Sequence, residues 1–351
     1  MQFYPLTVKD IRRETRDCVS VAFDVPETLV DIFSFTQGQY LTLKTYINGQ
    51  EVRRSYSICT APDEKDLRVA IKEVENGLFS TFANRNLKTS DVIEVMPPNG
   101  HFFTEIHPQN QQSYVFFAAG SGITPVISNI KTILKNEPES YVTLLYGNQK
   151  VSTIIFKEEI EALKNIYLGR FQIFNILSRE HTESDLLNGR LNEDKIRKFV
   201  RFVPSLLHAD HFFACGPEDI IFASKNVLTE HGIPEEKIHF ELFNAPKNVA
   251  KKASPEAAVE SMATIRLDGL TLQVPVEKGQ NILDAAQQFG SDMPYACKGG
   301  VCCTCRAKLI EGEVEMEANY ALTKKEVEDG FILTCQAVPK TKIVKIDFDI
   351  K

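Results

Sequence analysis

The chain has 351 residues and a formal net charge of −7, and it is 43% hydrophobic and 25% charged. That length can bury two or three hydrophobic cores, which predicts several domains. The acidic balance argues against nucleic-acid binding, because phosphate neutralisation needs a basic face. No apolar run reaches the roughly 20 residues of a membrane span, and the first residues are not typical of a secretory or transit signal. We therefore expect a cytoplasmic location.

The first third of the chain has the pattern of short β-strands separated by turns. Residues 19–25 and 67–72 alternate apolar and polar side chains, and residues 37–43 do so less strictly. One helix is expected near residues 80–87. The pattern predicts an antiparallel β-barrel over residues 1–107.

A short motif in this β-region, R-S-Y-S at residues 54–57, combines a cation, a flat aromatic ring and hydroxyls. If the segment is extended, Arg54 and Tyr56 point to one face, where they can hold a phosphate and a flat ring together. An ordinary barrel wall is the alternative. Two later motifs favour a binding site. G-L-F-S at residues 77–80 looks like a glycine turn opening a helix that can bind a pyrophosphate, and P-P-N-G-H-F at 97–102 closes the barrel.

From about residue 110 the pattern changes to alternating strands and helices. Apolar runs predict buried strands, and amphipathic segments between them predict helices. The expected strands are 113–119, 141–146, 171–177, 211–215 and 238–243, and the expected helices are 126–134, 154–163, 192–199 and 218–230. This alternation predicts a doubly wound parallel α/β sheet over residues 108–244.

The first strand-to-helix turn of the α/β region is G-S-G-I-T-P at residues 120–125. Its two glycines allow close backbone approach, and the helix N-terminus that follows favours an anion such as a dinucleotide pyrophosphate. A tight turn without a ligand is the alternative, because the third glycine of G-x-G-x-x-G is missing. A second motif, C-G-P-E, occupies residues 215–218. For Cys215 alone, a small buried residue at a strand end is the alternative.

Residues 245–261 are predicted to be a linker, because they contain several prolines and lysines and little apolar surface to bury. Beyond them, residues 263–268 and 270–275 predict a hairpin, and residues 282–289 predict a helix with Asn281 as its N-cap. The charged run at residues 311–317 predicts an edge strand in preference to a docking surface.

Four cysteines carry the chemistry of residues 262–351. Cys297, Cys302 and Cys305 form C-x4-C-x2-C, and Cys335 supplies a distant fourth thiolate, which is the plant-type [2Fe–2S] pattern. The glycines at 299–300 can adopt positive φ, which lets the backbone wrap around a cluster.

Zinc and disulfides are the alternative uses of these cysteines. Structural zinc usually takes its thiolates from two short C-x2-C pairs, whereas three of these cysteines share one loop. Structural disulfides do not fit the reducing compartment that we expect. The extra thiol, Cys303, is expected to turn away from the cluster.

The order R-x-Y-S, G-x-x-S, P-x-G-x-F resembles the flavin barrels of the ferredoxin–NADP reductase superfamily. The resemblance implies that Arg54 contacts the flavin phosphates, that Tyr56 stacks on the isoalloxazine, and that Ser57 reaches the N5 region of the ring. It also implies that Gly77 and Ser80 lie at the pyrophosphate. The flavin is expected to be FAD.

In the same superfamily, G-x-G-x-x-P is the nicotinamide-nucleotide loop and C-G-P lies beside the nicotinamide. The resemblance implies a nucleotide site that includes Gly120, Gly122, Thr124, Cys215, Gly216 and Pro217.

The residues that follow the third strand of the α/β region bear on the choice of nucleotide. Ser178 and Arg179 combine a hydroxyl and a guanidinium, which suits a 2′-phosphate, and they resemble the S-R pair of plant-type ferredoxin–NADP reductases. We expect NADPH. The alternative is that Arg179, next to Glu180, is a solvated surface charge, and NADH then remains open.

Residues 262–351 resemble plant-type ferredoxin, which implies an α+β β-grasp fold. The whole chain is thus predicted to be a multidomain NAD(P)H-dependent reductase that passes electrons from NADPH through FAD and a [2Fe–2S] cluster. No catalytic acid–base residues are needed. The implied acceptor is an oxygenase component, first a di-iron epoxidase, with a steroid hydroxylase or an acyl desaturase as alternatives. A non-redox protein that binds a nucleotide and zinc is a third hypothesis.

Overall fold

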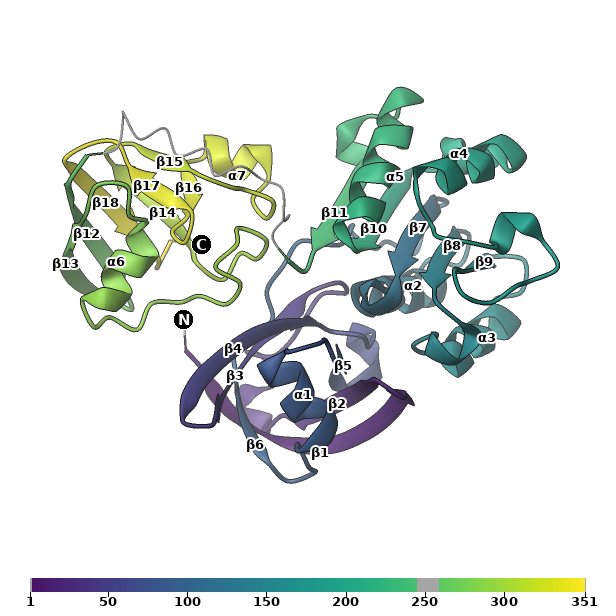
Figure 1. Cartoon of the computed structure of the whole chain (residues 1–351), viewed down its shortest axis with the longest axis horizontal. Helices are drawn as coiled ribbons and strands as arrows, with labels where there is room; N and C mark the ends of the chain where they lie inside the picture. The colour runs from purple at the N-terminus through teal and green to yellow at the C-terminus, as the bar shows by residue number, and fades with distance from the viewer. Residues whose placement is uncertain (1, 245–258, 351) are drawn as a thin grey trace. The chain divides into compact units, whose positions relative to one another are not determined.

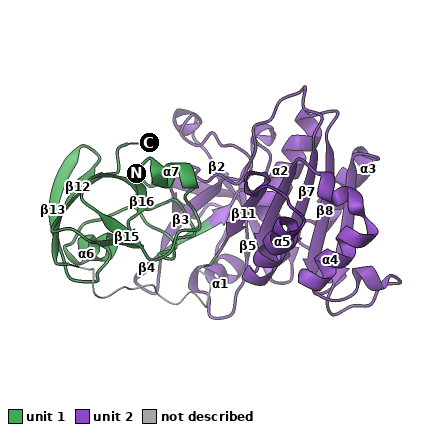
Figure 2. Ribbon diagram, turned by 90° about the horizontal axis from the view of Figure 1, so that it is seen from above, with its two compact units in different colours: residues 1–3, 53–55, 244–351 green, residues 4–52, 56–243 purple. Residues whose placement is uncertain are grey.

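A computed structural model describes residues 2–244 and 259–350. They divide into two compact units (Figure 2). The larger unit comprises Tyr4–Val52 and Tyr56–Phe243, and the smaller unit comprises the described residues of 1–3, 53–55 and 244–351. Most of the linker predicted at 245–261 lies outside the described residues.

A six-stranded antiparallel sheet forms the first part of the larger unit, as predicted (Figure 1). Its strand order is β4-β3-β6-β1-β2-β5. Inward-facing aliphatic side chains from all the long strands fill its core. The strands are β1 (Tyr4–Thr15), β2 (Cys18–Asp24), β3 (Tyr40–Ile47), β4 (Gln50–Ser57), β5 (Leu67–Lys72) and β6 (Val92–Val95). Helix α1 (Leu78–Arg85) and the 3-10 turns η1 (Glu27–Leu29) and η2 (Pro62–Glu64) lie between them in the chain.

The second part of the larger unit is a five-stranded parallel sheet of order β11-β10-β7-β8-β9, which confirms the predicted doubly wound fold. The central strand is continuously apolar because helices cover both faces of such a sheet. The strands are β7 (Ser113–Ala119), β8 (Tyr141–Asn148), β9 (Phe171–Leu177), β10 (His211–Gly216) and β11 (Ile238–Leu242). The helices are α2 (Ile123–Asn136), α3 (Lys157–Ile166), α4 (Glu193–Phe202) and α5 (Glu218–Glu230).

Short 3-10 turns complete this part: η3 (Gly120–Gly122), η4 (Val151–Thr153), η5 (Asp185–Leu187), η6 (Pro204–His208) and η7 (Glu235–Lys237). Over residues 2–244 and 259–350, no helix combines the length and the apolar character needed to cross a membrane.

Helix α2 joins the antiparallel and parallel sheets into one unit. Ser128 and Asn129 are completely buried because their side chains bond to backbone of the first part. The Ser128 hydroxyl donates to the carbonyl of Thr60 (2.7 Å), and the Asn129 amide donates to the carbonyl of Phe102 (2.9 Å). Gly38 fits into the same contact, since a Cβ there would lie 2.0 Å from the Phe102 carbonyl oxygen.

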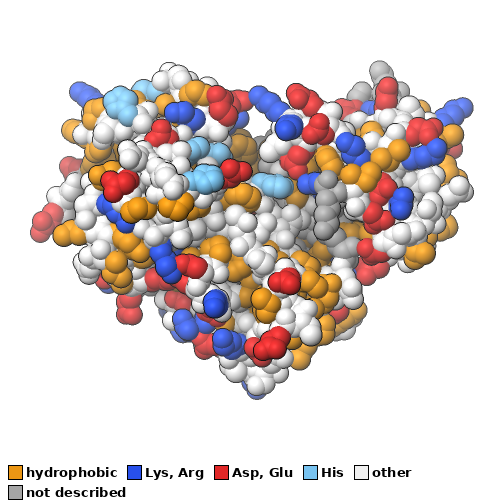
Figure 3. Space-filling view, turned by 180° about the vertical axis from the view of Figure 1, so that it is seen from behind, with side chains coloured by type: hydrophobic (Ala, Val, Ile, Leu, Met, Phe, Trp, Pro, Cys, Tyr) orange, Lys and Arg blue, Asp and Glu red, His pale blue; other side chains and the backbone are white. Residues whose placement is uncertain are grey.

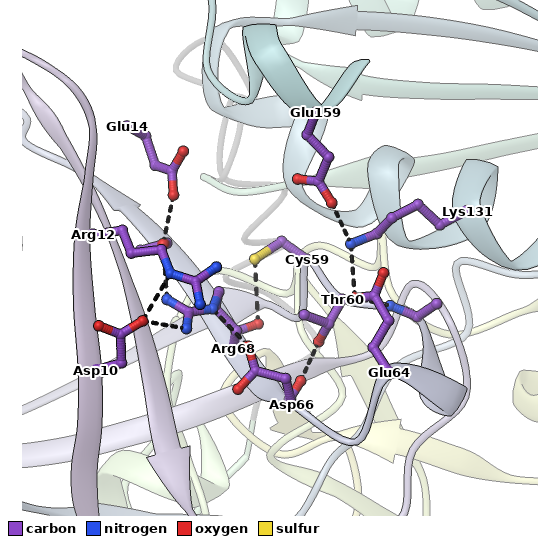
Figure 4. Close-up of polar contacts among 12 residues, drawn as sticks. Asp10, Arg12, Glu14, Cys59, Thr60, Glu64, Asp66, Arg68, Lys131 and Glu159 are labelled. Carbon is purple, nitrogen blue, oxygen red and sulfur yellow. Dashed lines mark hydrogen bonds and ion pairs between the residues drawn. The ribbon is translucent and has the colours of Figure 1, made fainter. Parts of the chain in front are cut away.

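Charged side chains cross the same joint (Figure 4). Lys131 of α2 is only 7% exposed, and its ammonium lies 2.9 Å from Glu64 of η2 and 2.8 Å from Glu159 of α3. Arg68 of β5 pairs with Asp10 nearby, and a cavity of about 300 Å³ lies among these groups. Removing both carboxylates around Lys131 would leave a buried charge uncompensated, which is strongly destabilising.

The smaller unit contains a five-stranded mixed sheet of order β13-β12-β18-β14-β16. Helix α6 packs its apolar face into the core of this unit, and the side chain of Asn281 caps it by accepting from the Asp284 N–H (2.8 Å), as predicted. The strands are β12 (Ser261–Leu267), β13 (Leu270–Val276), β14 (Arg306–Glu311), β16 (Phe331–Leu333) and β18 (Ile343–Asp347), and the helices are α6 (Ile282–Gln288) and α7 (Lys324–Glu328). The parallel pairing of β12 with β18, amid antiparallel pairs, gives the expected α+β fold.

The edge strand predicted for residues 311–317 is present but shorter than predicted, because a turn interrupts the segment. Strand β14 ends at Glu311, and Gly312, with φ of 90°, turns the chain into β15 (Val314–Met316), which pairs with β17 (Ala337–Pro339). A Cβ on Gly312 would lie 2.4 Å from the Ile343 carbonyl oxygen, so only glycine fits this turn.

Candidate functional site

Strand β4 presents the residues predicted to hold the flavin. Arg54 is exposed, Tyr56 is half-buried and Ser57 is buried, as expected for an extended strand at the edge of its sheet. The Tyr56 ring lies 5.5 Å from the ring of Phe79 in α1, measured between centroids. This contact fixes an aromatic surface on which a flat ring can stack.

Gly77 and Ser80 form the turn that precedes α1. The Ser80 hydroxyl accepts from the Val74 N–H (3.2 Å) and donates to the Gly77 carbonyl (3.3 Å), so it is engaged within the turn. A Cβ on Gly77 would lie 2.4 Å from the Ser80 oxygen. The first-turn N–H groups of α1 have no intrahelical partner. These backbone N–H groups, rather than the Ser80 hydroxyl, can therefore bind an anion.

The glycine loop and the C-G-P motif lie far apart in the chain but meet at the carboxyl edge of the parallel sheet. A Cβ on Gly122 would lie 2.1 Å from the Cys215 carbonyl oxygen, and one on Gly216 would lie 3.2 Å from the Ala119 backbone. We expected Gly122 to allow approach of a pyrophosphate. The structure shows that it is required first for packing of η3 against the end of β10.

Two helices begin at this edge. Thr124 lies in the first turn of α2, where its hydroxyl donates to the Ser121 carbonyl (3.0 Å), and Pro217 is the N-cap of α5. Strands β7 and β10 are neighbours, yet the chain reaches β10 only after crossing β8 and β9. This is a topological switch point, where open α/β sheets bind their ligands.

Glu241 of β11 was not predicted as a site residue. It accepts a hydrogen bond from the Ser57 hydroxyl (3.1 Å), and in the sheet it is aligned with Cys215. Burial raises the pKa of Glu241 to about 8, although the Ser57 bond acts in the opposite direction. Burial, and then the charge of Glu241, raise the pKa of the Cys215 thiol. The site therefore contains a carboxyl that can exchange a proton near neutral pH beside a thiol that stays protonated.

Lys72 of β5 is a second residue that sequence analysis missed. Its ammonium lies 3.6 Å from a carboxylate oxygen of Asp17 and 3.9 Å from where a Cβ on Gly120 would be. The antiparallel sheet thus supplies a half-buried cation beside the glycine loop of the parallel sheet.

Ser178 and Arg179 lie at the carboxyl end of the edge strand β9, as expected. The Ser178 N–H donates to the carbonyl of Asn148 (2.9 Å), which holds the segment beside the end of β8. The Glu180 carboxylate accepts from the Val151 N–H (2.9 Å) and so is engaged locally. Across the described part of the chain, the exposed guanidinium of Arg179 forms no salt bridge.

The four predicted cluster cysteines converge in the smaller unit. The sulfurs of Cys302 and Cys297 are 3.1 Å apart. Hydrogen bonds from Cys302 and Cys335 lower the pKa of Cys297 to about 2, and Cys335 also contacts Cys305. Such a group of thiols can supply the thiolates that bind iron.

The loop backbone is shaped to this group of sulfurs. The Gly299 N–H donates to the Cys297 sulfur (3.3 Å), and the amide of Gln336 donates to the Cys335 sulfur (3.6 Å). Of the two loop glycines only Gly300 has positive φ, at 72°, and the other left-handed residue is Lys298 at 50°. Donors to sulfur are the environment that an iron–sulfur cluster needs.

Cys303 turns away from the other thiols. Its buried S–H donates to the carbonyl of Ala321 (3.4 Å), and burial raises its pKa to about 12, so it stays protonated.

Three family models match successive parts of the chain. Residues 5–104 match the oxidoreductase FAD-binding domain, residues 116–226 match the oxidoreductase NAD-binding domain, and residues 265–340 match the 2Fe-2S iron-sulfur cluster binding domain.

Curated relatives match over almost the full length. One component of the 1,2-phenylacetyl-CoA epoxidase of Escherichia coli (strain K12) is 40% identical over 350 residues, covering 99% of this chain and 98% of that protein. The ferredoxin reductase component of the 3-ketosteroid-9-alpha-monooxygenase of Rhodococcus rhodochrous is 32% identical, covering 98% and 96%.

Solved structures show the same fold. Phthalate dioxygenase reductase matches with a TM-score of 0.60 and 20% identity, covering 99% of this chain and 98% of that one. A type IV self-sufficient cytochrome P450 monooxygenase matches with a TM-score of 0.71 and 20% identity, covering 98% of this chain and 41% of that one.

Proposed function

Because this chain belongs to the family of NAD(P)H-dependent oxygenase reductases that join FAD-binding and NAD-binding domains to a C-terminal [2Fe–2S] domain, we propose that its acceptor is a phenylacetyl-CoA epoxidase. We also propose NADPH as its electron source. The reaction class follows from the family: electrons pass from NAD(P)H through FAD and the cluster to an oxygenase component. The support for this acceptor is the 40% identity to the epoxidase component over 99% of the chain. A place in phenylacetate catabolism, in the cytoplasm, would follow.

On the flavin side, bound FAD supplies the conversion from two-electron to one-electron transfer. Arg54 binds the phosphates by a charge-assisted contact, and Tyr56 orients the ring by stacking. Ser57, which donates a hydrogen bond to Glu241 (3.1 Å), would contact the reacting edge of the bound ring. The turn at Gly77 and Ser80 presents the N–H groups of α1 to the pyrophosphate.

On the nucleotide side, the loop Gly120–Gly122 and the first turn of α2, which contains Thr124, bind the pyrophosphate. Lys72 adds a cation from β5 to this loop. The segment Cys215-Gly216-Pro217 positions the nicotinamide, because its backbone is fixed against Gly122 and Ala119. These residues bind and orient, and none is required to act as a catalytic acid or base.

In the smaller unit, Cys297, Cys302, Cys305 and Cys335 are the proposed cluster ligands. The converging sulfurs and the N–H donors of Gly299 and Gln336 support this assignment.

The acceptor is tested by reconstitution. The purified reductase is combined with the oxygenase components of the Escherichia coli phenylacetyl-CoA epoxidase, or with a 3-ketosteroid 9α-hydroxylase oxygenase. We expect nucleotide oxidation to be coupled to epoxide formation with the first and to be largely uncoupled with the second. Coupling only to the steroid system, or to neither, would remove the proposed acceptor and leave the reductase class intact.

NADPH preference rests on Arg179, whose guanidinium has no salt bridge among the described residues while Glu180 is engaged with Val151. Dye reduction should be measured with each nucleotide in wild type, Arg179→Ala and the control Arg201→Ala, which removes an exposed arginine from α4. Arg179→Ala should lose about 1.5–3 kcal/mol of specificity for NADPH and little for NADH. An equal loss with both nucleotides would make Arg179 an ordinary surface charge.

A further inference from the structure

Two histidines outside the residues assigned above face each other across β10 and β11. Nδ1 of His211 and Nε2 of His239 are 3.2 Å apart, a hydrogen-bonding distance for ring nitrogens. The His239 ring stacks on Phe213 at 4.5 Å between centroids, and the His211 ring stacks on Tyr114 at 5.6 Å. The aromatic contacts hold both imidazoles in place, which indicates a fixed pair.

This pair continues the line of groups that starts at Ser57. Glu241 accepts from Ser57 at 3.1 Å, and His239 lies two residues before Glu241 on β11. Side chains two apart on a strand share one face, with Cα atoms about 6.6–6.8 Å apart. A proton can pass across that gap only if the Glu241 carboxyl turns toward His239 or one water lies between them. His211 is half-buried, so part of its side chain is open to water. Several histidine side chains, which are not labelled individually, are exposed on the face drawn in Figure 3.

The reductase reaction requires a route for one proton. A hydride brings two electrons and one proton to the flavin, and the cluster accepts the electrons only, one at a time. Each time the flavin is reoxidised, one proton must therefore leave its N5 edge. Ser57 and Glu241 can take that proton, but Ser57 is buried and Glu241 is half-buried, so the proton still needs a route to bulk water.

We propose that His239 and His211 conduct this proton from Glu241 to water. The proposal rests on the proposed flavin position at Ser57. Ser57 accepts the flavin proton while its own hydroxyl proton moves to the Glu241 carboxylate. Glu241 then passes a proton to His239, which releases one from Nε2 to Nδ1 of His211, and His211 releases one to water. No proton is gained or lost by the protein over the cycle.

The environment of the two histidines keeps both imidazoles uncharged at neutral pH. Burial lowers the pKa of His211, and burial together with the neighbouring His211 lowers the pKa of His239 to about 4. The other charged groups that act on the pair are Asp210, Lys237 and Glu137, all of which act on His211. At neutral pH each imidazole is therefore uncharged, with one donor nitrogen and one acceptor nitrogen, which a relay needs.

The test follows the two half-reactions separately in the flavin- and cluster-loaded protein. Stopped-flow absorbance gives flavin reduction by the nucleotide and flavin reoxidation by ferricyanide, and a pH-indicator dye in weak buffer gives proton release. For His239→Phe we expect unchanged flavin reduction, with reoxidation and proton release both slowed by about tenfold or more. The solvent deuterium isotope effect on reoxidation should rise, and added imidazole should restore the rate. The matched control His208→Phe, at an exposed histidine of η6, should behave as wild type.

Unchanged reoxidation and proton release in both His239→Phe and His211→Phe would overturn the relay, as would an equal slowing of both half-reactions without imidazole rescue. Ser57→Ala separates this failure from that of the flavin placement. If Ser57→Ala alters flavin reduction while the histidine variants change nothing, only the relay is wrong; if Ser57→Ala also changes nothing, the flavin placement is wrong. NMR of labelled histidines gives a second readout, since His211→Gln should raise the pKa of His239.

Discussion

The cluster loop and the flavin–nucleotide site differ in how far along the chain their parts lie. Three of the four proposed cluster ligands lie within residues 297–305, and all four lie in one compact unit. Ser57 and Glu241 are 184 residues apart, yet they share a hydrogen bond. The first site is a local property of one loop and its neighbouring strand. The second site exists only because α2 holds the two sheets together. A substitution in the cluster loop should therefore affect the cluster alone, whereas one at the contact between the sheets should affect flavin and nucleotide binding.

The largest expected effect is at the cluster. Cys302→Ala removes one of the four proposed thiolates and should abolish the cluster, whereas Cys303→Ala should keep it because the Cys303 thiol points to Ala321. Iron and sulfide analysis, with the visible spectrum, measures both variants. If Cys303→Ala also lost its iron, the ligand register would be wrong by one residue. Flavin content should stay unchanged in both.

The next effect tests the packing of the glycine loop against the end of β10. In Gly122→Ala the new Cβ would overlap the Cys215 carbonyl at 2.1 Å, so the backbone must shift, at a cost of about 3 kcal/mol. The control Gly232→Ala also introduces a side chain, at φ of 78° but in open space, and should cost only about 1–2 kcal/mol. Denaturant unfolding followed by flavin fluorescence compares them. Equal losses would mean that packing against β10 does not constrain the loop.

Arg54 offers a smaller and more specific change. Arg54→Ala should weaken FAD binding by about 1.5–3 kcal/mol, the usual contribution of a hydrogen bond to a charged group, and should leave the cluster intact. Flavin release on dilution, followed by fluorescence, measures the loss. Arg16→Ala, which removes an exposed arginine after β1, is the control. Full flavin occupancy in Arg54→Ala would place the phosphates elsewhere.

The last effect concerns pH. Burial raises the pKa of Glu241 from 4.5 to about 8, so the folded protein binds more protons than the unfolded chain between those values. Stability should therefore fall as pH rises from about 4.5 to about 8 and then level off. Glu241→Gln cannot ionise and should lose this part of the pH dependence, with the difference from wild type growing toward pH 8. Thermal unfolding across that range checks it, and parallel curves would show that Glu241 ionises freely.

Much of the fold could be predicted from local patterns. The strands at 67–72, 113–119 and 171–177 and the helix at 218–230 have the predicted bounds, because apolar runs and helical periodicity directly reflect burial. Helix α2 begins at Ile123, three residues before the predicted start, since Pro125 is tolerated in a first turn. The edge strand predicted at 311–317 was drawn too long because the alternating pattern hid the turn at Gly312, where glycine is needed because of the distant Ile343.

The candidate site likewise contains residues that the sequence could predict and residues that it could not. The cysteine spacing and the glycine loop are local signals, and the structure brings their members together. Glu241 and Lys72 carry no local signal, since each is one polar residue in an alternating strand and its importance comes from a residue far away in the chain. A polar residue on the buried face of a strand was the only available sign for Glu241.

The buried polar face of α2 also limits how this protein can be recombined with others. Ser128, Asn129 and Lys131 are buried only because Thr60, Phe102 and Glu64 meet them. A chimera cut near residue 107 would leave these groups facing a foreign surface without matched partners. Replacing everything after residue 244 leaves every one of these bonds in place. Domain exchange in this architecture should therefore keep Tyr4–Val52 and Tyr56–Phe243 together, and it should treat residues 53–55 as belonging with the C-terminal part.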